Sequence, residues 1–433
     1  MSRGRLRVRS RGLRILYLHQ FFMTREGTGG TRSYEFARHL VGRGHDVTMV
    51  TAAPGAPARR RDVEGIRVVE VAGASPDYVT ATGAGYGARM AGFARFAAGA
   101  TVAALRAPAP DVVFATSPPL TIGLPGIAAA RRHRVPLVFE VRDLWPEAPI
   151  QMGALRNPLA RTAARALERR VLGAARHVVA LSPGIRDGVA AAGVEPERVT
   201  LIPNASDLDL FSPEVDPGDL RGRLGLEDAF VCSYFGTMGE ANDLTQVIEA
   251  AAILAERGEN GVAFVLQGDG KRRPALESHV RMRGLGNVLL LPAGDKRSAA
   301  RLAAASDACM TIFKDVPILA TNSPNKLFDT FAAGRPAVVN TDGWQRELVE
   351  RSHAGLAARP GDPEHLAEQV LWLRDHPAEA AEYRRNARRL AETEFDRRLL
   401  AERLERVLVA AASDVTPEAV LRPPSAGPQA PLE

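Results

Sequence analysis

The stretch that decides the fold is residues 321–340, TNSPNKLFDTFAAGRPAVVN. It predicts a helix capped by Ser323, with Pro324 at its first position, where the missing N–H is not needed. Gly334 is placed to end that helix. The apolar, β-branched run at 336–340 then predicts a buried parallel strand. A capped helix followed at once by a buried strand is typical of an α/β domain.

The start of this helix also carries candidate ligand-binding groups. Free backbone N–H groups are expected at Asn325, Lys326 and Leu327, at the positive end of the helix dipole and beside a lysine, which suits a phosphate. Asp329 follows one turn on, where its carboxylate suits sugar hydroxyls. The pattern favours a nucleotide or nucleotide-sugar. A capped packing helix without a ligand explains the same residues equally well.

Length and composition fit a globular chain of two domains. The 433 residues suit two domains of roughly 200 residues each. The net charge is +6, and six arginines gather near the start, at positions 3, 5, 7, 9, 11 and 14. This basic run either contacts anionic lipid or nucleic acid, or is simply a solvated end. It has no apolar core of a secretion signal, and no apolar run of about 18 residues spans a bilayer.

Cysteine and histidine usage points to a cytoplasmic chain without a metal site. Cys232 and Cys309 each lie in an apolar, strand-like run, so no disulfide framework is indicated. The nine histidines form neither an HxH nor an HExxH spacing.

The first half alternates apolar strands with helices, which predicts a doubly wound parallel sheet with ligands at the carboxyl ends of its strands. The expected strands are 13–19, 45–51, 66–71, 111–116, 136–141, 177–181 and 199–202.

Two of these strand ends carry candidate chemistry. The turn at 27–30, GTGG, is not a GxGxxG, and no acidic residue follows the second strand, so a Rossmann dehydrogenase is not expected. Gly29 and Gly30 let the backbone approach a diphosphate or sugar closely, unless they only form a tight turn. At the other strand end, Arg142 is suited to a phosphate and Asp143 to a sugar hydroxyl. A structural Arg–Asp pair is the alternative.

The second half repeats the plan after a linker at 203–218 rich in turn formers. Strands are expected at 230–235, 262–267, 287–291 and 307–313, and helices from 366 to 411. Their loops carry further candidates for the same edge of the sheet: Gly236, Thr237, Gly268, Lys271 and Lys296.

The predicted boundaries follow from this plan. They give a disordered basic tail at 1–12, a first domain at 13–212 and a second at 213–395. A helix at 396–411 is expected to pack back towards the first domain, and a proline-rich disordered tail is expected at 412–433.

The order of these pieces resembles the retaining nucleotide-sugar glycosyltransferases of family 4. The resemblance runs from about 13 to 409 and is closest to the bacterial branch that transfers acetamido-deoxy sugars in O-antigen or capsule biosynthesis. The segments that carry it are 16–22 (LYLHQFF), 29–38 (GGTRSYEFAR), 44–48 (GHDVT), 141–147 (VRDLWPE), 202–204 (IPN), 268–270 (GDG), 323–329 (SPNKLFD) and 332–336 (AAGRP).

The resemblance implies a GT-B architecture, in which two Rossmann-like domains face each other across a cleft and the second domain holds the donor. It implies that Asp329 holds the nucleotide ribose and that the N–H groups of Lys326 and Leu327 bind the diphosphate. The loop at 294–296 matches the loop against the base, and Gly29 and Gly30 match the loop facing the donor phosphates.

For catalysis, the resemblance places Arg142 where many relatives carry an active-site histidine, beside Asp143. It implies transfer with retention, in which the leaving diphosphate deprotonates the incoming hydroxyl, and it implies no metal or other cofactor.

The chain departs from the family at two points. Thr321 stands where the family has the first acidic residue of its E-x7-E motif, and 236–243 lacks the usual basic residues. The counter-charge for the diphosphate is then expected from Lys326, Lys296, Lys271 or Arg142.

The leading hypothesis is a cytoplasmic retaining glycosyltransferase that uses a UDP-linked, N-acetylated sugar. Its acceptor would be a lipid-linked saccharide or a small molecule, with peripheral contact to an anionic membrane and no nucleic-acid partner. Thr321 and the loop 236–243 motivate an alternative, a non-catalytic binding or scaffold protein. A nucleotide-sugar 2-epimerase is a further alternative that the scattered histidines disfavour.

Overall fold

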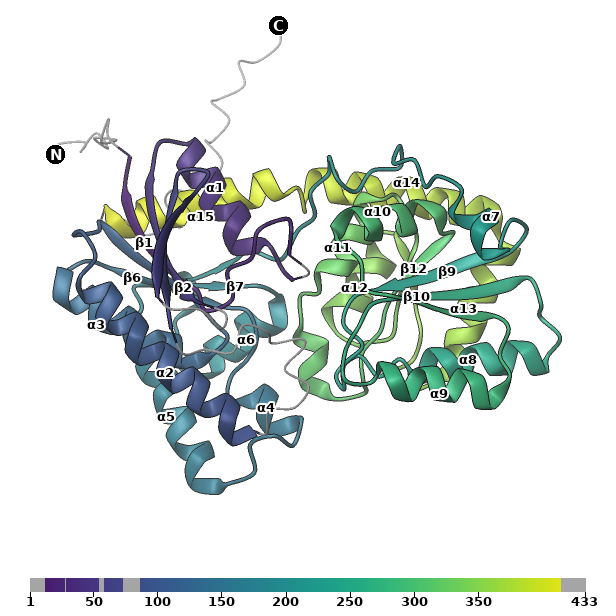
Figure 1. Ribbon diagram of the computed structural model, residues 1–433, viewed down its shortest axis with the longest axis horizontal. Helices are drawn as coiled ribbons and strands as arrows, with labels where there is room; N and C mark the ends of the chain where they lie inside the picture. The colour runs from purple at the N-terminus through teal and green to yellow at the C-terminus, as the bar shows by residue number, and fades with distance from the viewer. Residues whose placement is uncertain (1–11, 28, 54–57, 73–85, 414–433) are drawn as a thin grey trace, which may run out of the picture.

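The structure of the chain is a computed structural model that describes residues 12–27, 29–53, 58–72 and 86–413 (Figure 1). The predicted tails, 1–12 and 412–433, lie outside the described residues except for Gly12, Ala412 and Ser413. Within the described ranges the chain forms two α/β domains, each built on one sheet. The predicted fold class, two Rossmann-like parallel-sheet domains, is confirmed.

The first sheet runs in the order β3-β4-β2-β1-β5-β6-β7-β8, and its pairs are parallel except β3 with β4. Its strands are β1 (Arg14–Leu18), β2 (Asp46–Ala52), β3 (Arg59–Val63), β4 (Ile66–Val71), β5 (Val112–Thr116), β6 (Leu137–Val141), β7 (His177–Ala180) and β8 (Val199–Leu201). The sequence-based prediction missed β3. This edge strand is polar and exposed on both faces, so it has no apolar pattern to reveal it.

Helices cover both faces of this sheet. Those that follow the strands in the first domain are α1 (Arg32–Gly42), α2 (Tyr86–Leu105), η1 (Leu120–Ile122), α3 (Gly123–His133), α4 (Glu147–Gln151), α5 (Pro158–Ala174), α6 (Pro183–Ala191) and η2 (Pro196–Arg198). One face is covered by α2, α3, α5 and α6. The other is covered by α1 together with α15 (Arg397–Ala412), which crosses from the second domain and buries Leu400, Leu404 and Leu408 there (Figure 1).

The second sheet is parallel throughout, in the order β11-β10-β9-β12-β13-β14. Its strands are β9 (Phe230–Phe235), β10 (Val262–Gln267), β11 (Val288–Leu291), β12 (Ala308–Thr311), β13 (Ala337–Val339) and β14 (Gly355–Ala357). The helices are α7 (Leu220–Leu224), α8 (Thr245–Glu256), α9 (Arg273–Arg283), α10 (Lys296–Ala305), η3 (Pro317–Thr321), α11 (Asn325–Ala332), α12 (Trp344–Arg351), α13 (Pro363–Asp375) and α14 (Pro377–Thr393).

The predicted helix at 321–340 is α11, with one correction at its start. Its N-cap is Pro324, in extended backbone, and not Ser323. The Ser323 hydroxyl instead accepts a hydrogen bond of 3.1 Å from the backbone N–H of Asn204, in the segment that joins the domains. The predicted stop is confirmed, because Gly334 has a φ of +60° directly after the helix.

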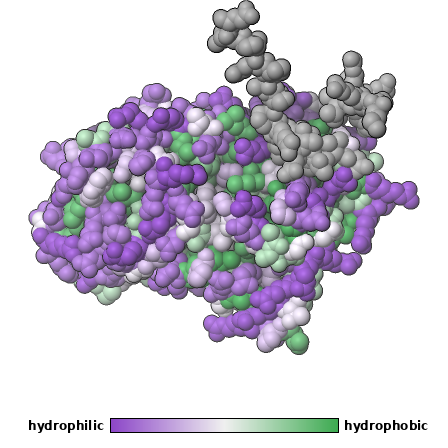
Figure 2. All heavy atoms as spheres, turned by 180° about the vertical axis from the view of Figure 1, so that it is seen from behind, coloured by the Kyte–Doolittle hydropathy of each residue, from purple (hydrophilic) through white to green (hydrophobic). Residues whose placement is uncertain are grey.

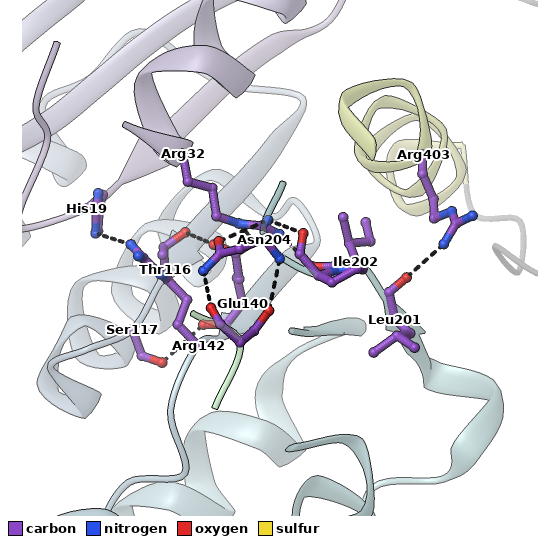
Figure 3. Close-up of polar contacts among 12 residues, drawn as sticks. His19, Arg32, Thr116, Ser117, Glu140, Arg142, Leu201, Ile202, Asn204 and Arg403 are labelled. Carbon is purple, nitrogen blue, oxygen red and sulfur yellow. Dashed lines mark hydrogen bonds and ion pairs between the residues drawn. The ribbon is translucent and has the colours of Figure 1, made fainter. Parts of the chain in front are cut away.

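A buried ion pair fixes the segment that links the two domains. Arg32, on α1, donates to Glu140 Oε1 on β6 at 2.8 and 3.0 Å, and both side chains are almost fully buried. The same guanidinium donates to the backbone carbonyls of Ile202 at 2.8 Å and Pro203 at 2.6 Å (Figure 3). Asn204 follows directly, and its amide donates to the Ser323 carbonyl at 2.6 Å. A single set of contacts therefore runs from the first sheet to the start of α11.

The domains also meet through an apolar contact. Ile318 and Leu319, on η3 of the second domain, are buried in the same core cluster as Leu144 and Ile185 of the first. The Ile318 N–H donates to the Gln151 side chain at 3.0 Å. Since η3 immediately precedes α11, this contact and the Asn204 bond hold the start of α11 from both sides.

We predict that Arg32→Leu destabilises the protein by about 3–5 kcal/mol, because it leaves the Glu140 carboxylate buried without its cation. The measurement is urea denaturation of the full chain. Arg32→Leu combined with Glu140→Leu should recover part of the loss. Arg67→Leu, which breaks the half-exposed pair with Asp46, is the control and should cost under about 1 kcal/mol. A small effect of Arg32→Leu would contradict the structural role given to this pair.

Candidate functional site

Lys326 lies at the start of α11 and reaches over the loop that follows β9. Its Nζ donates to the Tyr234 hydroxyl at 2.5 Å and sits 3.9 Å from the centre of the Tyr234 ring. A Cβ on Gly236, whose φ is +137°, would lie 3.3 Å from the same Nζ. Burial lowers the pKa of Lys326 to about 7. The structure therefore holds a lysine that gains its full charge most easily when an anion is beside it.

Asp329 is buried one turn further along α11. Its side chain is only 6% exposed, and its Oδ1 has no hydrogen-bond partner. Burial raises the pKa of this carboxyl, while Lys296 of α10 and Arg397 of α15 act in the opposite direction. Burial also lowers the pKa of Lys296, and Asp329 opposes that shift. A buried carboxylate oxygen without a donor is costly, and a ligand hydroxyl would supply the missing hydrogen bond.

Residues of the first domain face the start of α11 directly. A Cβ on Gly30 would lie 3.4 Å from Asn325 Nδ2 and 3.6 Å from Arg142 Nη2. The structure thus brings together three predicted site residues from separate segments and both domains. Gly29 is explained differently, because a Cβ there would lie 2.4 Å from Met23 Sδ within the same loop.

His19, which directly follows β1, joins this group and was not among the predicted site residues. Its Nε2 lies 3.4 Å from Arg142 Nη1, and its Nδ1 lies 2.8 Å from Ser33 Oγ (Figure 3). The signal was present in the sequence, since polar residues just after a buried strand were the reason to select Arg142 and Asp143. Burial raises the pKa of Asp143, and the charge of Arg142 opposes that shift.

Three predicted donor-site residues, Gly268, Thr237 and Leu327, make contacts within the protein, and a fourth, Lys271, lies apart from α11. A Cβ on Gly268 would lie 1.8 Å from the Gly236 carbonyl oxygen, so this glycine lets two loops pack together. The Thr237 carbonyl accepts from the Tyr234 hydroxyl at 2.6 Å. The Leu327 N–H donates to the Pro324 carbonyl at 3.2 Å, so it is not free as predicted. Lys271 is exposed in the turn before α9, and no contact described for it joins it to α11.

Thr321 takes part in a contact between the domains. Its hydroxyl donates to the Ile318 carbonyl at 2.7 Å, and its own carbonyl accepts from the Ser182 hydroxyl of α6. A Cβ on Gly184 would lie 2.9 Å from its methyl group. This threonine fills a close approach between η3 and α6.

Within the described part of the chain, no three His, Cys, Asp or Glu side chains are grouped closely enough to hold a metal ion. The expected independence of metals stays a prediction. The start of α11 instead offers two cations, Lys326 and Arg142, and, one turn on, a buried carboxylate with one oxygen that lacks a hydrogen-bond partner. This arrangement suits a ligand that carries both anionic groups and hydroxyls.

Comparison with known proteins finds one family match in each domain. Residues 27–205 match the family described as Glycosyl transferase 4-like domain. Residues 229–376 match the family described as Glycosyl transferases group 1. The first match begins after β1 and includes the other strands of the first sheet, and the second match includes every strand of the second sheet.

Individual relatives are distant. The chain is 25% identical over 253 residues to the alpha-D-kanosaminyltransferase of Streptomyces kanamyceticus, covering 56% of this chain and 62% of that protein. It is 29% identical over 386 residues to D-inositol 3-phosphate glycosyltransferase 1 of Catenulispora acidiphila, covering 83% and 85%. The structure of Anabaena Alr3699/HepE in complex with UDP-glucose superposes with a TM-score of 0.69 at 20% identity, covering 92% and 100%. This last likeness supports the fold alone.

We predict that Lys326→Met stabilises the ligand-free protein at pH 7, by on the order of 2 kcal/mol. The pKa of Lys326 is about 7 in the folded chain and higher in the unfolded chain. The unfolded chain therefore binds the extra proton between pH 7 and 10, and wild-type stability rises with pH across that window.

Lys326→Met removes this contribution, so its advantage should shrink as the pH rises from 7 towards 10. Urea denaturation at several pH values measures both quantities, with the exposed Lys314→Met as the control. An advantage that does not change with pH would contradict the assignment to the buried ammonium.

Proposed function

Taking as premise that the chain joins a glycosyl transferase 4-like domain to a domain of the glycosyl transferases group 1, we propose that it transfers a sugar from a UDP-sugar to a hydroxyl of an acceptor, with retention of configuration. The observation that carries the proposal is the start of α11. A lysine and a helix N-terminus suited to a diphosphate lie one turn from a buried carboxylate that has an oxygen without a donor.

The donor half of the proposal assigns each group a role. Lys326, the free N–H groups at the start of α11 and Arg142 hold the diphosphate, and Asp329 accepts from the nucleotide ribose. We choose uridine as the base by analogy with the protein of the same fold that was solved with UDP-glucose. We assign an N-acetylated sugar on the resemblance described above, and a metal-independent reaction in which the leaving diphosphate takes the proton.

The acceptor half of the proposal is a lipid-linked saccharide or a small molecule. A lipid-linked acceptor requires contact with a membrane surface, and no helix among the described residues is long and apolar enough to cross a bilayer. We therefore propose peripheral contact with an anionic membrane, made by the face of the first domain formed by α2, α3 and α5, the basic face.

The composition of the basic face supports this contact. These three helices contain a single acidic residue, Glu168, and burial beside Glu147 raises its pKa to about 7. They carry exposed arginines, among them Arg131, Arg169 and Arg170. Four of the six large apolar side chains exposed in the described chain lie on them: Val102, Leu105, Leu124 and Leu159. Arginines with interspersed apolar side chains suit an anionic bilayer surface.

From behind, the projecting end of the first domain, at the lower right of Figure 2, is mostly hydrophilic with apolar residues at its tip. Leu159 of α5 is the most exposed of the four apolar side chains on the basic face, at 81%.

Thr321 bears on the non-catalytic alternative. It is the last residue of η3 and packs against α6, and as a threonine it supplies no carboxylate to the transferred sugar. Release of UDP that requires acceptor favours the transferase. Donor binding without turnover, across lipid-linked and soluble acceptors, favours the binding protein.

We predict that UDP or a UDP-sugar raises the thermal midpoint of the wild type and that Asp329→Asn weakens this effect. A ligand at about 100 times its dissociation constant adds roughly 2.7 kcal/mol, a measurable shift. Asp342→Asn, at an exposed position in a neighbouring loop, is the matched control. No shift with any nucleotide would exclude the proposed donor, and an equal shift in Asp329→Asn would exclude the ribose role.

We predict that Arg131→Glu, Arg169→Glu and Arg170→Glu combined abolish most binding of the full chain to vesicles with one quarter phosphatidylglycerol. Reversing three charges removes roughly 1 kcal/mol or more per residue near the surface. Co-sedimentation at low and high salt measures the loss. Arg281→Glu, Arg301→Glu and Arg385→Glu combined make the same charge change on the second domain and should leave binding intact. If the two triple variants behave alike, the basic face is not the contact.

A further inference from the structure

His19 is buried between two arginines and pairs with neither as an ion. It is only 1% exposed, and burial together with the charges of Arg142 and Arg32 keeps the pKa of its ring well below the usual range. The other groups that face it are Ser33 on α1 and the edge of the Phe21 ring. A charged imidazole in this position would face two cations without a carboxylate partner, so the ring is neutral.

The contacts of His19 also fix which nitrogen carries the proton. A guanidinium only donates hydrogen bonds, so Nε2, which faces Arg142 Nη1 at 3.4 Å, must be the acceptor. The proton therefore sits on Nδ1, which donates to Ser33 Oγ at 2.8 Å. Ser33 belongs to the first turn of α1, so the ring is held by an element that the Arg32–Glu140 pair already fixes.

We propose that His19 is a positioning residue: as the Nδ1-protonated neutral ring, it accepts a hydrogen bond from Arg142 and directs that guanidinium to the place where the donor diphosphate gathers charge. The proposal rests on the proposed function for the identity of the anion. Figure 3 shows the His19 ring and the Arg142 guanidinium turned toward one another, from the ends of two different strands.

Among the contacts described for Arg142, the hydrogen bond to His19 is the one that fixes the direction of its guanidinium. The adjacent carboxylate, Asp143, attracts it along its own loop, and Glu140 is already engaged by Arg32. A free arginine side chain has many rotamers, and a fixed acceptor restricts them before the ligand arrives, so less conformational entropy is lost on binding. The need is greater here because the loop 236–243 supplies no basic residue.

Two conservative substitutions of His19 test the roles of its two ring nitrogens separately. In His19→Gln the side-chain oxygen reaches the position of Nε2, so the acceptor for Arg142 is kept. In His19→Asn the shorter amide reaches only the position of Nδ1, so the group facing Ser33 is kept and the acceptor for Arg142 is lost. If His19 had only a structural role, His19→Gln would not bind UDP more tightly than His19→Asn.

The experiment is calorimetric titration of the full chain with UDP, for wild type, both His19 variants, Arg142→Ala and the His19→Asn/Arg142→Ala double variant. We expect Arg142→Ala and His19→Asn each to weaken UDP binding about tenfold, which is about 1.4 kcal/mol. His19→Gln should stay within about twofold of wild type. The double variant should bind no more weakly than Arg142→Ala alone, because His19 acts through Arg142. Thermal midpoints of all variants show whether each one folds.

Additive losses in the double variant, or equal losses in His19→Gln and His19→Asn, would overturn the proposal. If the wild type does not bind UDP, the proposed donor fails, and the inference is decided by ¹⁵N NMR of the histidine ring. The inference would be supported by a protonated Nδ1 together with an unprotonated Nε2 whose ¹⁵N chemical shift changes in Arg142→Ala. A protonated Nε2, or a resonance unchanged by Arg142→Ala, would overturn it.

Discussion

The arrangement of the two domains depends on the ion pair between Arg32 and Glu140. Both charges are buried, and such a pair is stable only when its remaining hydrogen-bonding groups are satisfied. In this pair the remaining groups are satisfied. Glu140 also accepts a hydrogen bond of 3.2 Å from the Thr116 hydroxyl, and Arg32 also donates to the carbonyls of Ile202 and Pro203. The charge that β6 places in the core is thus neutralised by α1, and the same arginine fixes where the chain leaves the first domain.

The position of residues 202 and 203 also determines where the start of α11 lies. Asn204 is the next residue, and its contacts with Ser323 place the start of α11 opposite Gly30 and Arg142. On the proposed function, the phosphate-binding helix start and the first-domain arginine meet because the core of the first domain sets the path of the linker. Lys326 and Asp329 are buried without a full set of charge and hydrogen-bond partners, so they destabilise the ligand-free protein. A ligand with an anionic group and hydroxyls would supply the missing partners and offset that free energy.

Local patterns predicted the parts of the structure that depend on local physics. The apolar runs marked most strands, and Gly334 follows the end of α11 with a φ of +60°, a conformation that glycine adopts far more readily than other residues. The polar strand β3 and the three-residue strand β14 were missed, since neither has an apolar run long enough to recognise. Ser323 was wrong as a cap because its hydroxyl is engaged by Asn204, which is 119 positions away in the sequence. The role of Thr321 depends on a contact between distant segments in the same way, and no spacing rule reveals it. His19 could have been selected, because it is a polar residue at the end of a buried strand, as Arg142 is.

The two departures from the family pattern have a common structural explanation. Thr321, at the end of η3, packs against α6, and its small neutral side chain lets the domains approach closely. A charged side chain at this position would have to lose its water against Gly184. The bare loop after β9 leaves room for Lys326, whose Nζ lies beside Gly236. At Thr321 and in the loop 236–243, the second domain has a neutral residue where the family has a charged one, and the smaller side chain allows a close contact. On the proposed function, the missing positive charge then comes from Arg142 of the first domain. Donor binding would therefore depend on the approach of the two domains, and the contacts through Asn204 and η3 already hold that approach in the ligand-free chain.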